Sequence, residues 1–373
     1  MPLPFCLCDT SPMPRRKTMP PPRTSSDHKK PISLKRLAEH LGLSSATVSI
    51  VINRKPLSDM IPEETKTRIW EAASRFNYRP NIIARSLRQQ RTYSIGVLLP
   101  EFSDGYSALV LSGIEDYLLG KGYAWLAASH RHKDELIREY PHLLYTRAVE
   151  GLITIDTPYD EHLPFPVVSV SGHQTIEGVT NIVLNHDRSA ELAIGHLHEL
   201  GHRRIAFIKG QSFSSDTQVR WDSIRKACRS FGITVDPQLV AQLEGVSPSP
   251  EPGYQAAKRI LANKVDFTAL FSFNDVSAIG AIRALQEADL HVPESVSVVG
   301  FDDIAVAAYH IPALTTIRQP LGHMGSLAAE TLVERIAARG NEGPALLEVE
   351  PELVVRESTA PLSTAKAVPS GKG

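Results

Sequence analysis

Cysteine is scarce in this sequence, because only three of its 373 residues are cysteines. Cys6 and Cys8 lie in the N-terminal tail, and Cys228 stands alone within a helical pattern. So few and so scattered cysteines exclude a disulfide framework and favour a reducing, cytoplasmic location. Cys6 and Cys8 resemble half of a metal site, but no partner ligands lie near them in the sequence, so we predict no metal there.

Long apolar runs are absent as well. No segment approaches the roughly 18 apolar residues of a transmembrane helix. Met1 is not followed by the basic and apolar stretches of a secretory signal. The sequence therefore predicts no membrane partner. Apolar residues make up 42% of the chain, which is enough for ordinary globular cores, and the length predicts two or three domains.

Motifs typical of enzymes are missing too. The chain has no glycine-rich dinucleotide loop after a strand, no Walker loop and no Gly-x-Ser-x-Gly elbow. His196 and His198 are two residues apart on a predicted helix and do not face one another. His130 and His132 share one face of an extended segment but lack a third ligand close by. We therefore predict no catalytic residue, no cofactor and no metal ion.

Positive charge, by contrast, is concentrated in the first quarter of the chain. Residues 1–91 hold 17 Lys and Arg against 7 Asp and Glu, a net charge of +10, whereas the remainder holds 23 against 34, a net charge of −11. A basic segment joined to an acidic body is typical of proteins whose partner carries phosphates. A solvated basic tail is the alternative, because Arg15, Arg16 and Lys17 lie in sequence rich in Pro, Ser and Thr. On composition, we predict that residues 1–30 and 362–373 are disordered tails.

Helical spacing predicts a small DNA-binding unit in residues 31–79. Ser33 is a candidate N-cap and Gly42 a stop for the first helix, a second helix begins at Ser44, and Pro62 opens a third. Two short helices joined by a tight turn form a helix-turn-helix signature, and a generic three-helix bundle is the alternative. Hydroxyl and amide side chains suit contacts with phosphates and base edges. The predicted DNA-contacting residues of this unit are Ser33, Ser44, Ser45, Ala46, Thr47, Ser49, Ile50 and Asn53.

Residues 92–361 alternate between apolar strand runs and helical stretches. This pattern predicts an α/β fold of two lobes, each with a parallel sheet covered by helices. We expect the lobe boundary near residue 209 and a return crossing near residue 317. The predicted strands are Ile95–Leu99, Ala124–Ala128, Leu152–Ile155, Val167–Val170, Ile205–Ile208, Ala269–Phe271 and Val296–Val299. The predicted helices are Ala108–Leu119, Ala190–Leu200, Ser223–Phe231, Gly253–Leu261 and Val276–Glu287.

Motifs along most of the chain, taken in order, resemble those of the lactose-repressor (LacI-type) family of transcriptional regulators. The resemblance covers residues 32 to about 358. Its motifs are Ile32–Ser44, Ala46–Ser49 with Asn53, Asn77–Asn81, Glu199–Ile205, Asn274-Asp275, Gly300–Ile304 and Leu314–Ile317.

The resemblance implies a repressor, acting on nucleoid DNA, whose sensor resembles a periplasmic sugar-binding protein. The implied partners are a pseudo-palindromic double-stranded DNA operator, a small-molecule effector, and a second copy of the chain in a homodimer or a dimer of dimers. The absence of a heptad repeat after Leu353 favours the dimer. The family also implies a hinge helix and linker in residues 80–91. There Asn81, Ala84 and Leu87 would contact the minor groove, with Leu87 as a wedge between base pairs. A leucine that packs on the sensor is the alternative.

One position departs from the family. Relatives commonly carry an arginine that reads guanine after Val48-Ser49, whereas this chain has Ile50. An apolar side chain can contact a thymine methyl group but cannot form a bidentate pair with guanine. We therefore expect an operator half-site unlike that of the arginine-bearing relatives.

The predicted effector site rests on polar residues that follow strand-like runs, because ligand groups in such folds come from the carboxyl ends of strands. By family correspondence, Arg220, Asn274 and Asp302 are the polar anchors, with structural salt bridges as the alternative. Asp187 is the predicted anchor from the first lobe, although a carboxylate there is also an ordinary helix cap. The predicted apolar walls are Tyr106 and Phe273, and the acidic residues expected to be structural are Asp275 and Asp303.

The predicted effector is a sugar or sugar derivative. Many sugar-responsive relatives stack a pyranose on an aromatic residue in the segment before Gly253, but Val246–Pro252 contains none, which argues against a simple hexose. Trp221 follows Arg220 on a helix and is expected to pack in the core. The alternative for the whole chain is the sugar-binding component of a transporter, which would need a signal peptide and no helix-turn-helix.

Overall fold

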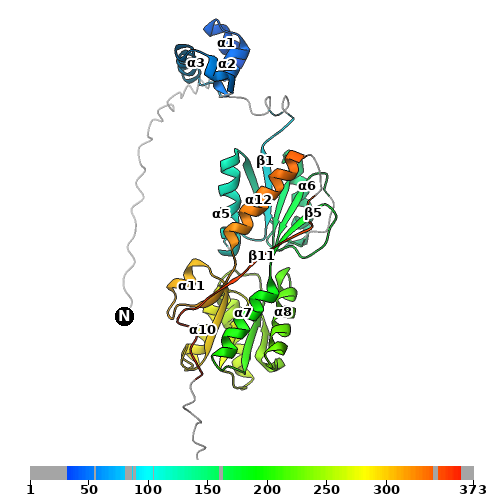
Figure 1. Cartoon of the computed structure of the whole chain (residues 1–373), viewed down its shortest axis with the longest axis vertical. Helices are drawn as coiled ribbons and strands as arrows, with labels where there is room; N and C mark the ends of the chain where they lie inside the picture. Colours follow the sequence, from blue (N-terminus) through cyan, green and yellow to red (C-terminus); the bar gives the residue numbers. More distant parts are fainter. Residues whose placement is uncertain are drawn as a thin grey trace, which may run out of the picture. The chain divides into compact units, whose positions relative to one another are not determined.

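The division of charge along the sequence almost coincides with a division of the structure. The computed structural model separates residues 1–89 from residues 90–373, as two units with their own internal contacts. In Figure 1 the two units can be found by colour, because the colours follow the sequence. The residues described are 32–53, 56–79, 86, 90–103, 105–158, 163–338 and 343–362. Leu362, predicted to begin a disordered tail, is described, and its backbone N–H donates to the Leu200 carbonyl.

Residues 32–53 and 56–79 of the first unit form three short α-helices, as the spacing predicted. Leu37 and Val48 from the first two helices and Ile69 from the third are almost fully buried in one apolar cluster. A short 3-10 turn, which the spacing did not indicate, precedes the last helix. The elements are α1 (Leu34–Leu41), α2 (Ser45–Ile52), η1 (Pro56–Met60) and α3 (Glu63–Arg75).

The first lobe of the second unit is a six-stranded sheet of order β11-β5-β4-β3-β1-β2, all of whose pairs are parallel. Its central strands are buried along their whole length, as expected for a parallel sheet with helices on both faces. The strands are β1 (Ser94–Leu99), β2 (Ala124–Ser129), β3 (Leu152–Ile155), β4 (Val167–Val170), β5 (Val179–Leu184) and β11 (Leu346–Val349). The helices are α5 (Gly105–Lys121), α6 (Asp134–Thr146) and α12 (Leu321–Ala338).

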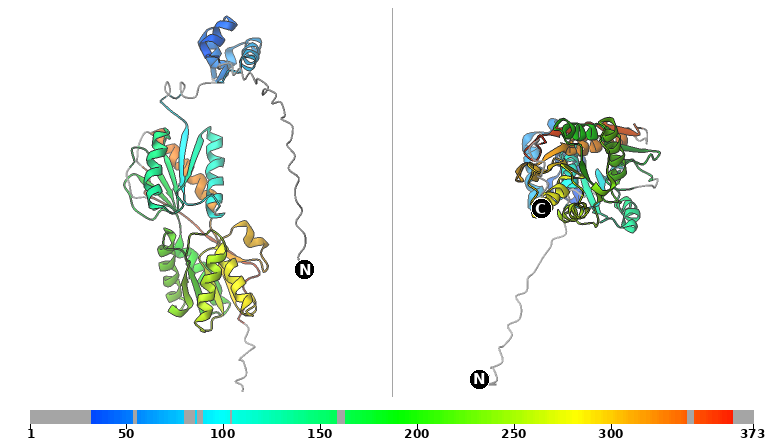
Figure 2. Two further views of the ribbon diagram at one scale, coloured as in Figure 1. Left: turned by 180° about the vertical axis from the view of Figure 1, so that it is seen from behind. Right: turned by 90° about the horizontal axis from the view of Figure 1, so that it is seen from below.

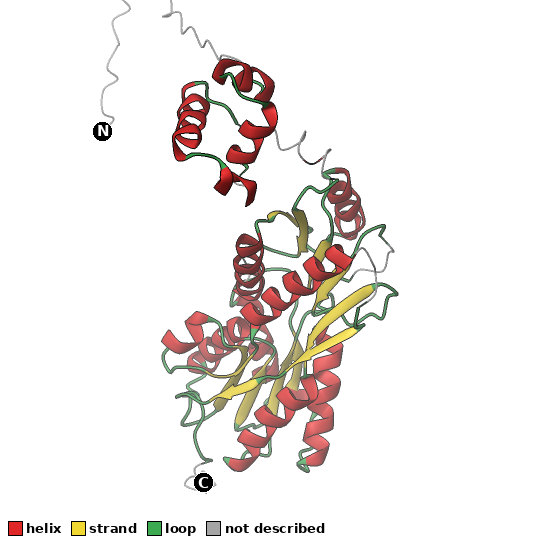
Figure 3. Cartoon of the chain, turned by 45° about the horizontal axis from the view of Figure 1, so that its top comes forward, coloured by secondary structure: helices red, strands yellow, loops and turns green. Residues whose placement is uncertain are grey.

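The second lobe repeats this plan with the order β12-β10-β9-β8-β6-β7, in which only the β10–β12 pair is antiparallel. Figure 3 shows helices on both sides of the strands. The strands are β6 (Ile205–Lys209), β7 (Val240–Gln242), β8 (Ala269–Ser272), β9 (Ser297–Asp302), β10 (Thr315–Arg318) and β12 (Glu352–Val354). The helices are α7 (His186–Glu199), α8 (Asp216–Ser230), η2 (Pro237–Leu239), α9 (Glu251–Ala262), α10 (Asp275–Glu287) and α11 (Ala305–Tyr309).

The chain crosses between the lobes three times, and the first crossing lies earlier than predicted. β5 belongs to the first sheet, but α7 packs on α8, β10 and β12 of the second, so the boundary is at Asn185 and not near residue 209. The return falls between β10 and α12, close to the expected residue 317. A third crossing, between β11 and β12, was not predicted. Figure 2 shows the two joined lobes from behind.

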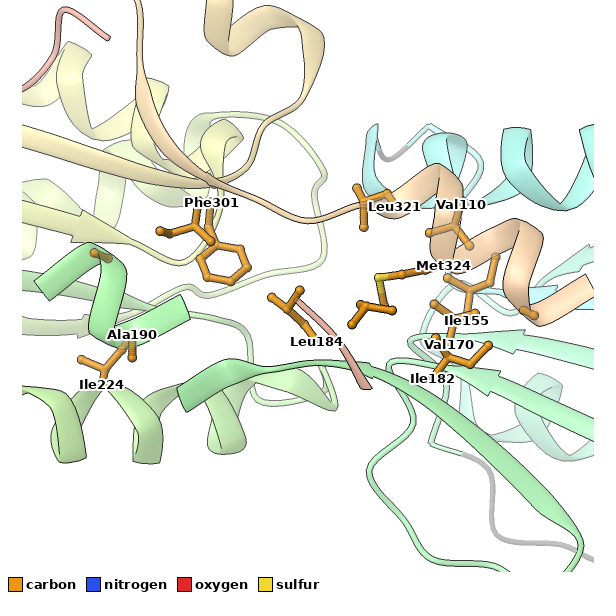
Figure 4. Close-up of a cluster of buried hydrophobic side chains, with 14 of the residues drawn as sticks. Val110, Ile155, Val170, Ile182, Leu184, Ala190, Ile224, Phe301, Leu321 and Met324 are labelled. Carbon is orange, nitrogen blue, oxygen red and sulfur yellow. The ribbon is translucent and has the colours of Figure 1, made fainter. Parts of the chain in front are cut away.

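Apolar side chains at the crossings join the cores of the two lobes. Leu184 ends β5 and Leu321 begins α12, and both are buried in a cluster that contains residues of both sheets. Figure 4 shows Leu184 between Phe301 of the second lobe and Met324 of the first. The crossings are therefore packed segments rather than free linkers.

Glycines set how closely α5 and α12 approach in the first lobe. A Cβ atom added to Gly113 would lie 1.8 Å from the carbonyl oxygen of Gly322, and one added to Gly325 would lie 2.0 Å from that of Val110. These distances are far inside van der Waals contact, so the helix pair requires hydrogen at both positions.

Candidate functional site

Serine caps begin both helices of the predicted helix-turn-helix. The Oγ atom of Ser33 accepts the backbone N–H of Arg36, and that of Ser44 accepts the N–H of Thr47 at 3.0 Å. Gly42 ends α1 in the left-handed region, with φ +65°, which a glycine adopts at no steric cost. These local interactions form the tight turn between α1 and α2.

The surface of α2 carries most of the predicted DNA-contacting residues. Ser45 and Ala46 are exposed, and Thr47, Ile50 and Asn53 are half-buried. Ser49, also a predicted DNA contact, is only 7% exposed, and the Asn53 amide donates to its carbonyl at 2.7 Å and to its Oγ at 3.2 Å. Asn53 lies one helical turn beyond Ser49 and covers it, so Ser49 positions Asn53 rather than offering a free hydroxyl. The other predicted contacts, Asn81, Ala84 and Leu87, lie outside the described residues.

A cavity lies between the two lobes of the second unit. The empty space between its walls, including the open mouth, is about 830 Å³. From the first lobe it is lined by Pro100, Glu101, Tyr106, His132 and Asp156. From the second it is lined by Gln211, Phe213, Ser214, Asp216, Arg220, Leu243, Val246, Ser247, Pro248, Ser249, Pro252, Phe273, Asn274, Val276, Ser277 and Asp302. Five of the six predicted effector residues are among them.

Arg220, on α8, is buried in the second-lobe lining of the cavity, where side chains and a backbone carbonyl contact its guanidinium. Its guanidinium donates to Asp216 Oδ2 at 2.9 Å and to the Phe273 carbonyl at 2.7 Å. The rings of Phe273 and Phe301 lie 4.3 Å and 3.7 Å from its Cζ atom. Its buried Nε atom alone has no hydrogen-bond partner among the described residues. The arginine is thus held in one orientation by its neighbours, with its Nε–H left unpaired among the described residues.

Asn274 follows the carboxyl end of β8, as predicted, and Asp302 is the last residue of β9. Asn274 caps α10, where its Oδ1 accepts the backbone N–H of Ser277 at 2.9 Å. Because this cap uses the amide oxygen, the NH2 group of Asn274 is the part of the side chain that remains for other contacts. Asp302 is 7% exposed, and its Oδ1 accepts the Gln319 amide at 2.6 Å. Both cavity side chains are therefore fixed by neighbours before any ligand binds.

Asp187 does not line the cavity. It begins α7 on the second lobe, where its carboxylate accepts Ser223 Oγ at 2.7 Å and Lys226 Nζ at 2.6 Å. The hydrogen bond and charge of Lys226 hold the pKa of this carboxyl below its usual range. Because α7 follows the crossing at Asn185, Asp187 belongs to the second lobe and not, as predicted, to the first, and it is not part of the cavity lining.

The first lobe instead contributes Asp156, which directly follows β3. Its Oδ1 accepts the backbone N–H of Ser215 at 3.0 Å and the Ser215 Oγ at 2.6 Å, so it joins the two lobes. Burial raises its pKa to about 6, and Asp216 adds to the effect. Asp156 could have been predicted from its position directly after a strand-like run, because the same criterion selected Asn274 and Asp302.

Aromatic rings reach the cavity from both lobes, and Tyr106 and Phe273 were predicted as site residues whereas His132 and Phe213 were not. His132 of the first lobe stacks on Phe213 of the second, with ring centroids 3.8 Å apart. Tyr106 shares a 2.6 Å hydrogen bond with Ser171, and burial raises its pKa well above the ordinary value. Trp221 packs edge-to-face on Phe207, in the core as expected. The segment before Gly253 lacks aromatics, but the cavity as a whole does not.

Asp275 and Asp303 are held by neighbouring residues, as expected for structural groups. Asp275 accepts Thr316 Oγ1 at 2.6 Å and the Ile304 N–H at 2.9 Å. Burial raises its pKa to about 7. Asp303 pairs with Arg318 at 2.7 Å and Arg356 at 2.6 Å.

Comparisons with known proteins divide the chain in the same way. Residues 33–81 match bacterial regulatory proteins of the lacI family, and residues 194–359 match the periplasmic binding protein-like domain. The HTH-type transcriptional repressor PurR of Haemophilus influenzae is 32% identical over 338 residues, covering 87% of this chain and 98% of the relative. This chain belongs to the LacI family. PurR of Yersinia enterocolitica is 34% identical over 337 residues, covering 88% and 97%.

Solved structures of LacI-family regulators share the whole architecture. The lac repressor dimer bound to operator and the anti-inducer ONPF has a TM-score of 0.78 and 26% identity, covering 89% of this chain and 100% of that one. The complex of the regulator CelR with cellobiose has a TM-score of 0.66 and 27% identity, covering 88% and 99%. The LacI-family chain described here is thus a DNA-binding transcriptional regulator, and its relatives are regulators rather than enzymes. None of its described helices has the length and apolar character needed to span a bilayer.

Proposed function

We propose that this LacI-family protein is a transcriptional repressor of nucleoid DNA, controlled by an uncharged, polyhydroxylated effector that binds between the two lobes. The observation that carries the proposal is the cavity itself, whose walls come from both lobes. Its lining combines carboxylates and an amide with aromatic faces. Carboxylate and amide groups bind sugar hydroxyls, and aromatic rings cover the apolar faces of a sugar ring.

Charge in the cavity favours a neutral ligand. Glu101, Asp156, Asp216 and Asp302 contribute carboxylates to the lining, and Arg220 is its only arginine or lysine among the described residues. Because that guanidinium is already paired with Asp216, no free cation is offered to a phosphate or an acid. A phosphorylated sugar would place its charge near several carboxylates. Relatives solved with cellobiose and with ribose support the same class.

A purine is the second candidate. The support is the similarity to several PurR repressors, at 31–34% identity over most of the chain. A planar base would stack on Phe273 or Phe213, and the Asn274 amide could pair with its edge. Purines belong in the same ligand screen for this reason.

Coupling to DNA follows from where the effector binds. A ligand shifts a conformational equilibrium only by its differential affinity for the two states, and coupling free energies are typically about 1–3 kcal/mol. A ligand that touches both lobes favours one arrangement of the lobes over another. We propose that residues 80–91 transmit this change to paired hinge helices, in a homodimer or a dimer of dimers on a pseudo-palindromic operator. The solved lac repressor dimer on its operator supports this arrangement.

The test is a thermal-shift screen of the full-length protein with sugars, sugar phosphates and purines, followed by operator titrations with and without each hit. We expect a neutral sugar or a purine to raise Tm and to change operator affinity at least fivefold, consistent with about 1 kcal/mol of coupling. A hit that raises Tm without changing operator affinity would contradict the regulatory role. Tight binding of sugar phosphates alone would contradict the ligand class.

A further inference from the structure

Two histidines and an aspartate from distant segments converge beside the effector cavity. His173 Nε2 lies 2.6 Å from Asp216 Oδ1, and His186 Nε2 lies 3.3 Å from the same oxygen. The three ligand atoms all lie within 4.8 Å of one another. His186 and Asp216 are buried, and His173 is half-buried. None of the three was predicted as a site residue from the sequence.

Each of these residues is placed by a different part of the sensor. His173 lies in the loop between β4 and β5, in the first lobe. His186 is the first residue of α7, directly after the crossing at Asn185, and Asp216 is the first residue of α8 in the second lobe. The cluster therefore forms only where the two lobes meet, which is why spacing along the sequence could not reveal it.

We propose that His173, His186 and Asp216 form an inter-lobe binding site for a late first-row divalent metal ion, with Zn²⁺ as the best match. Two imidazoles and one carboxylate are a donor set that suits zinc and its neighbours rather than Mg²⁺ or Ca²⁺, which prefer oxygen ligands. Three protein ligands leave one position of a tetrahedral site open, as in zinc sites that bind an exchangeable ligand.

The distances suit a cluster that can admit an ion. With metal–ligand bonds of 2.0–2.1 Å, neighbouring ligand atoms of a tetrahedral zinc site are roughly 3.3–3.4 Å apart. The His186–Asp216 separation of 3.3 Å already has this value. The His173–Asp216 separation of 2.6 Å is a hydrogen bond and would have to open by less than about 1 Å. The half-buried His173, on a loop, is the ligand best able to move.

The surroundings of the cluster bear on the proposal in three ways. Arg220 donates to Asp216 Oδ2 at 2.9 Å, which leaves Oδ1 for the ion and orients the carboxylate, as outer-shell donors do in metal sites. The positive charge of Arg220 opposes a cation and limits its affinity. His186 Nδ1, on the other side of the ring from the ligand atom Nε2, is buried without a hydrogen-bond partner among the described residues, so no outer-shell acceptor fixes this imidazole there.

Access to the cluster is available from two sides. His173 lines a second cavity together with Gly172 and Ser215, and Asp216 lines the effector cavity. An ion held here would tie the β4–β5 loop of the first lobe to α8 of the second. Metal binding would therefore stabilise the arrangement of the lobes seen here, independently of which effector the cavity takes.

The test is a Co²⁺ titration of the full-length protein, because tetrahedral Co²⁺ absorbs visible light when it occupies a zinc site. The parent carries Cys6→Ser and Cys8→Ser and has no affinity tag, so that the tail offers no thiolate. His173→Gln and His186→Gln each remove one ligand. His323→Gln, which removes an exposed histidine of α12, is the matched control.

We expect the parent and His323→Gln to bind one Co²⁺ per chain and Zn²⁺ to displace it. His173→Gln and His186→Gln should bind at least tenfold more weakly. Zn²⁺ should also raise Tm of the parent but not of His173→Gln, which remains informative if the buried His186→Gln fails to fold. No saturable Co²⁺ absorption, or equal binding by the parent and His173→Gln, would overturn the proposal. Either of these two outcomes would leave the screen for sugars and purines unaffected.

Discussion

The two units of this LacI-family regulator carry their function in opposite ways. In the first unit most of the predicted DNA-contacting residues lie between Ser44 and Asn53, on α2 and at its two ends, on the surface of a small three-helix core. In the second unit the cavity is built from residues spread between Pro100 and Asp302, and most of them are fixed by neighbours. A surface site made by one helix is readable from local sequence, whereas a cavity between lobes depends on the whole fold.

The largest expected effect separates the two units completely. Removal of residues 1–89 should abolish operator binding and leave a folded sensor that still binds its effector. The cut spares Arg91, whose guanidinium pairs with Glu150 at 2.9 Å and anchors the start of the sensor. Gel-shift and thermal-shift measurements on the truncated protein test this. Operator binding that survives the deletion would show that the sensor itself reads DNA.

The pH dependence of stability should belong to the sensor, because it buries Asp275. The pKa of this carboxyl is raised from 3.8 to about 7. Between these values the folded state keeps a proton that the unfolded state releases, so stability falls as pH rises from about 4 to 7 and then levels off, by at most about 4 kcal/mol. Chemical unfolding of the parent and of Asp275→Asn between about pH 4 and 7 measures this change in stability. The difference between the two curves should change with pH, and a constant difference would contradict the shift.

Close helix packing makes the sensor sensitive to a single methyl group. Gly113→Ala should lower its free energy of unfolding by about 2 kcal/mol, because the added Cβ would meet the Gly322 carbonyl oxygen and force α5 away from α12. Gly120→Ala, on the same helix with open space around it, is the matched control. Denaturant unfolding of both variants checks this, and equal stabilities would show that the helix pair adjusts freely.

The smallest effect concerns the caps of the first unit. Ser44→Ala should destabilise it by about 1 kcal/mol, because the N–H of Thr47 loses its acceptor. Ser45→Ala, one residue further along and exposed, should change stability by less than about 0.5 kcal/mol. Thermal unfolding followed by helical circular dichroism of residues 32–79 compares the two. If both substitutions cost the same, the cap is not what begins α2.

Local signals explain what could be predicted. Ser33, Ser44 and Gly42 delimit α1 and α2 through bonds to residues within four positions, so their pattern is visible in the sequence. Continuous apolar runs indicated β1, β2, β3, β4, β6, β8 and β9, whereas β7, β10, β11 and β12 were not predicted. β5 was missed because Thr180 and Asn181 interrupt its apolar run, although all six of its residues are buried.

Some site residues could not be predicted because their positions depend on contacts between segments that are far apart in the sequence. Asp187 and Asp216 are both carboxylates in the first turn of a helix, and nothing local says which one faces the cavity. The choice depends on the crossing at Asn185, which puts α7 in the second lobe and turns Asp187 toward Lys226. His173 meets Asp216 for the same reason, because the loop after β4 lies against the start of α8 only in the folded sensor.

The measurement that tests the account most directly is one set of operator titrations, with and without the identified effector, at a fixed salt concentration. It compares the parent with Arg220→Ala and Ile50→Arg. Arg220→Ala should bind the parent's operator but lose the effector response, because the cavity loses its oriented guanidinium and Asp216 loses one of its three partners. Ile50→Arg should prefer a different half-site, with guanine at the position that it reads, and keep the response. If Arg220→Ala responds like the parent, or Ile50→Arg loses its response, the separation of the two functions is contradicted.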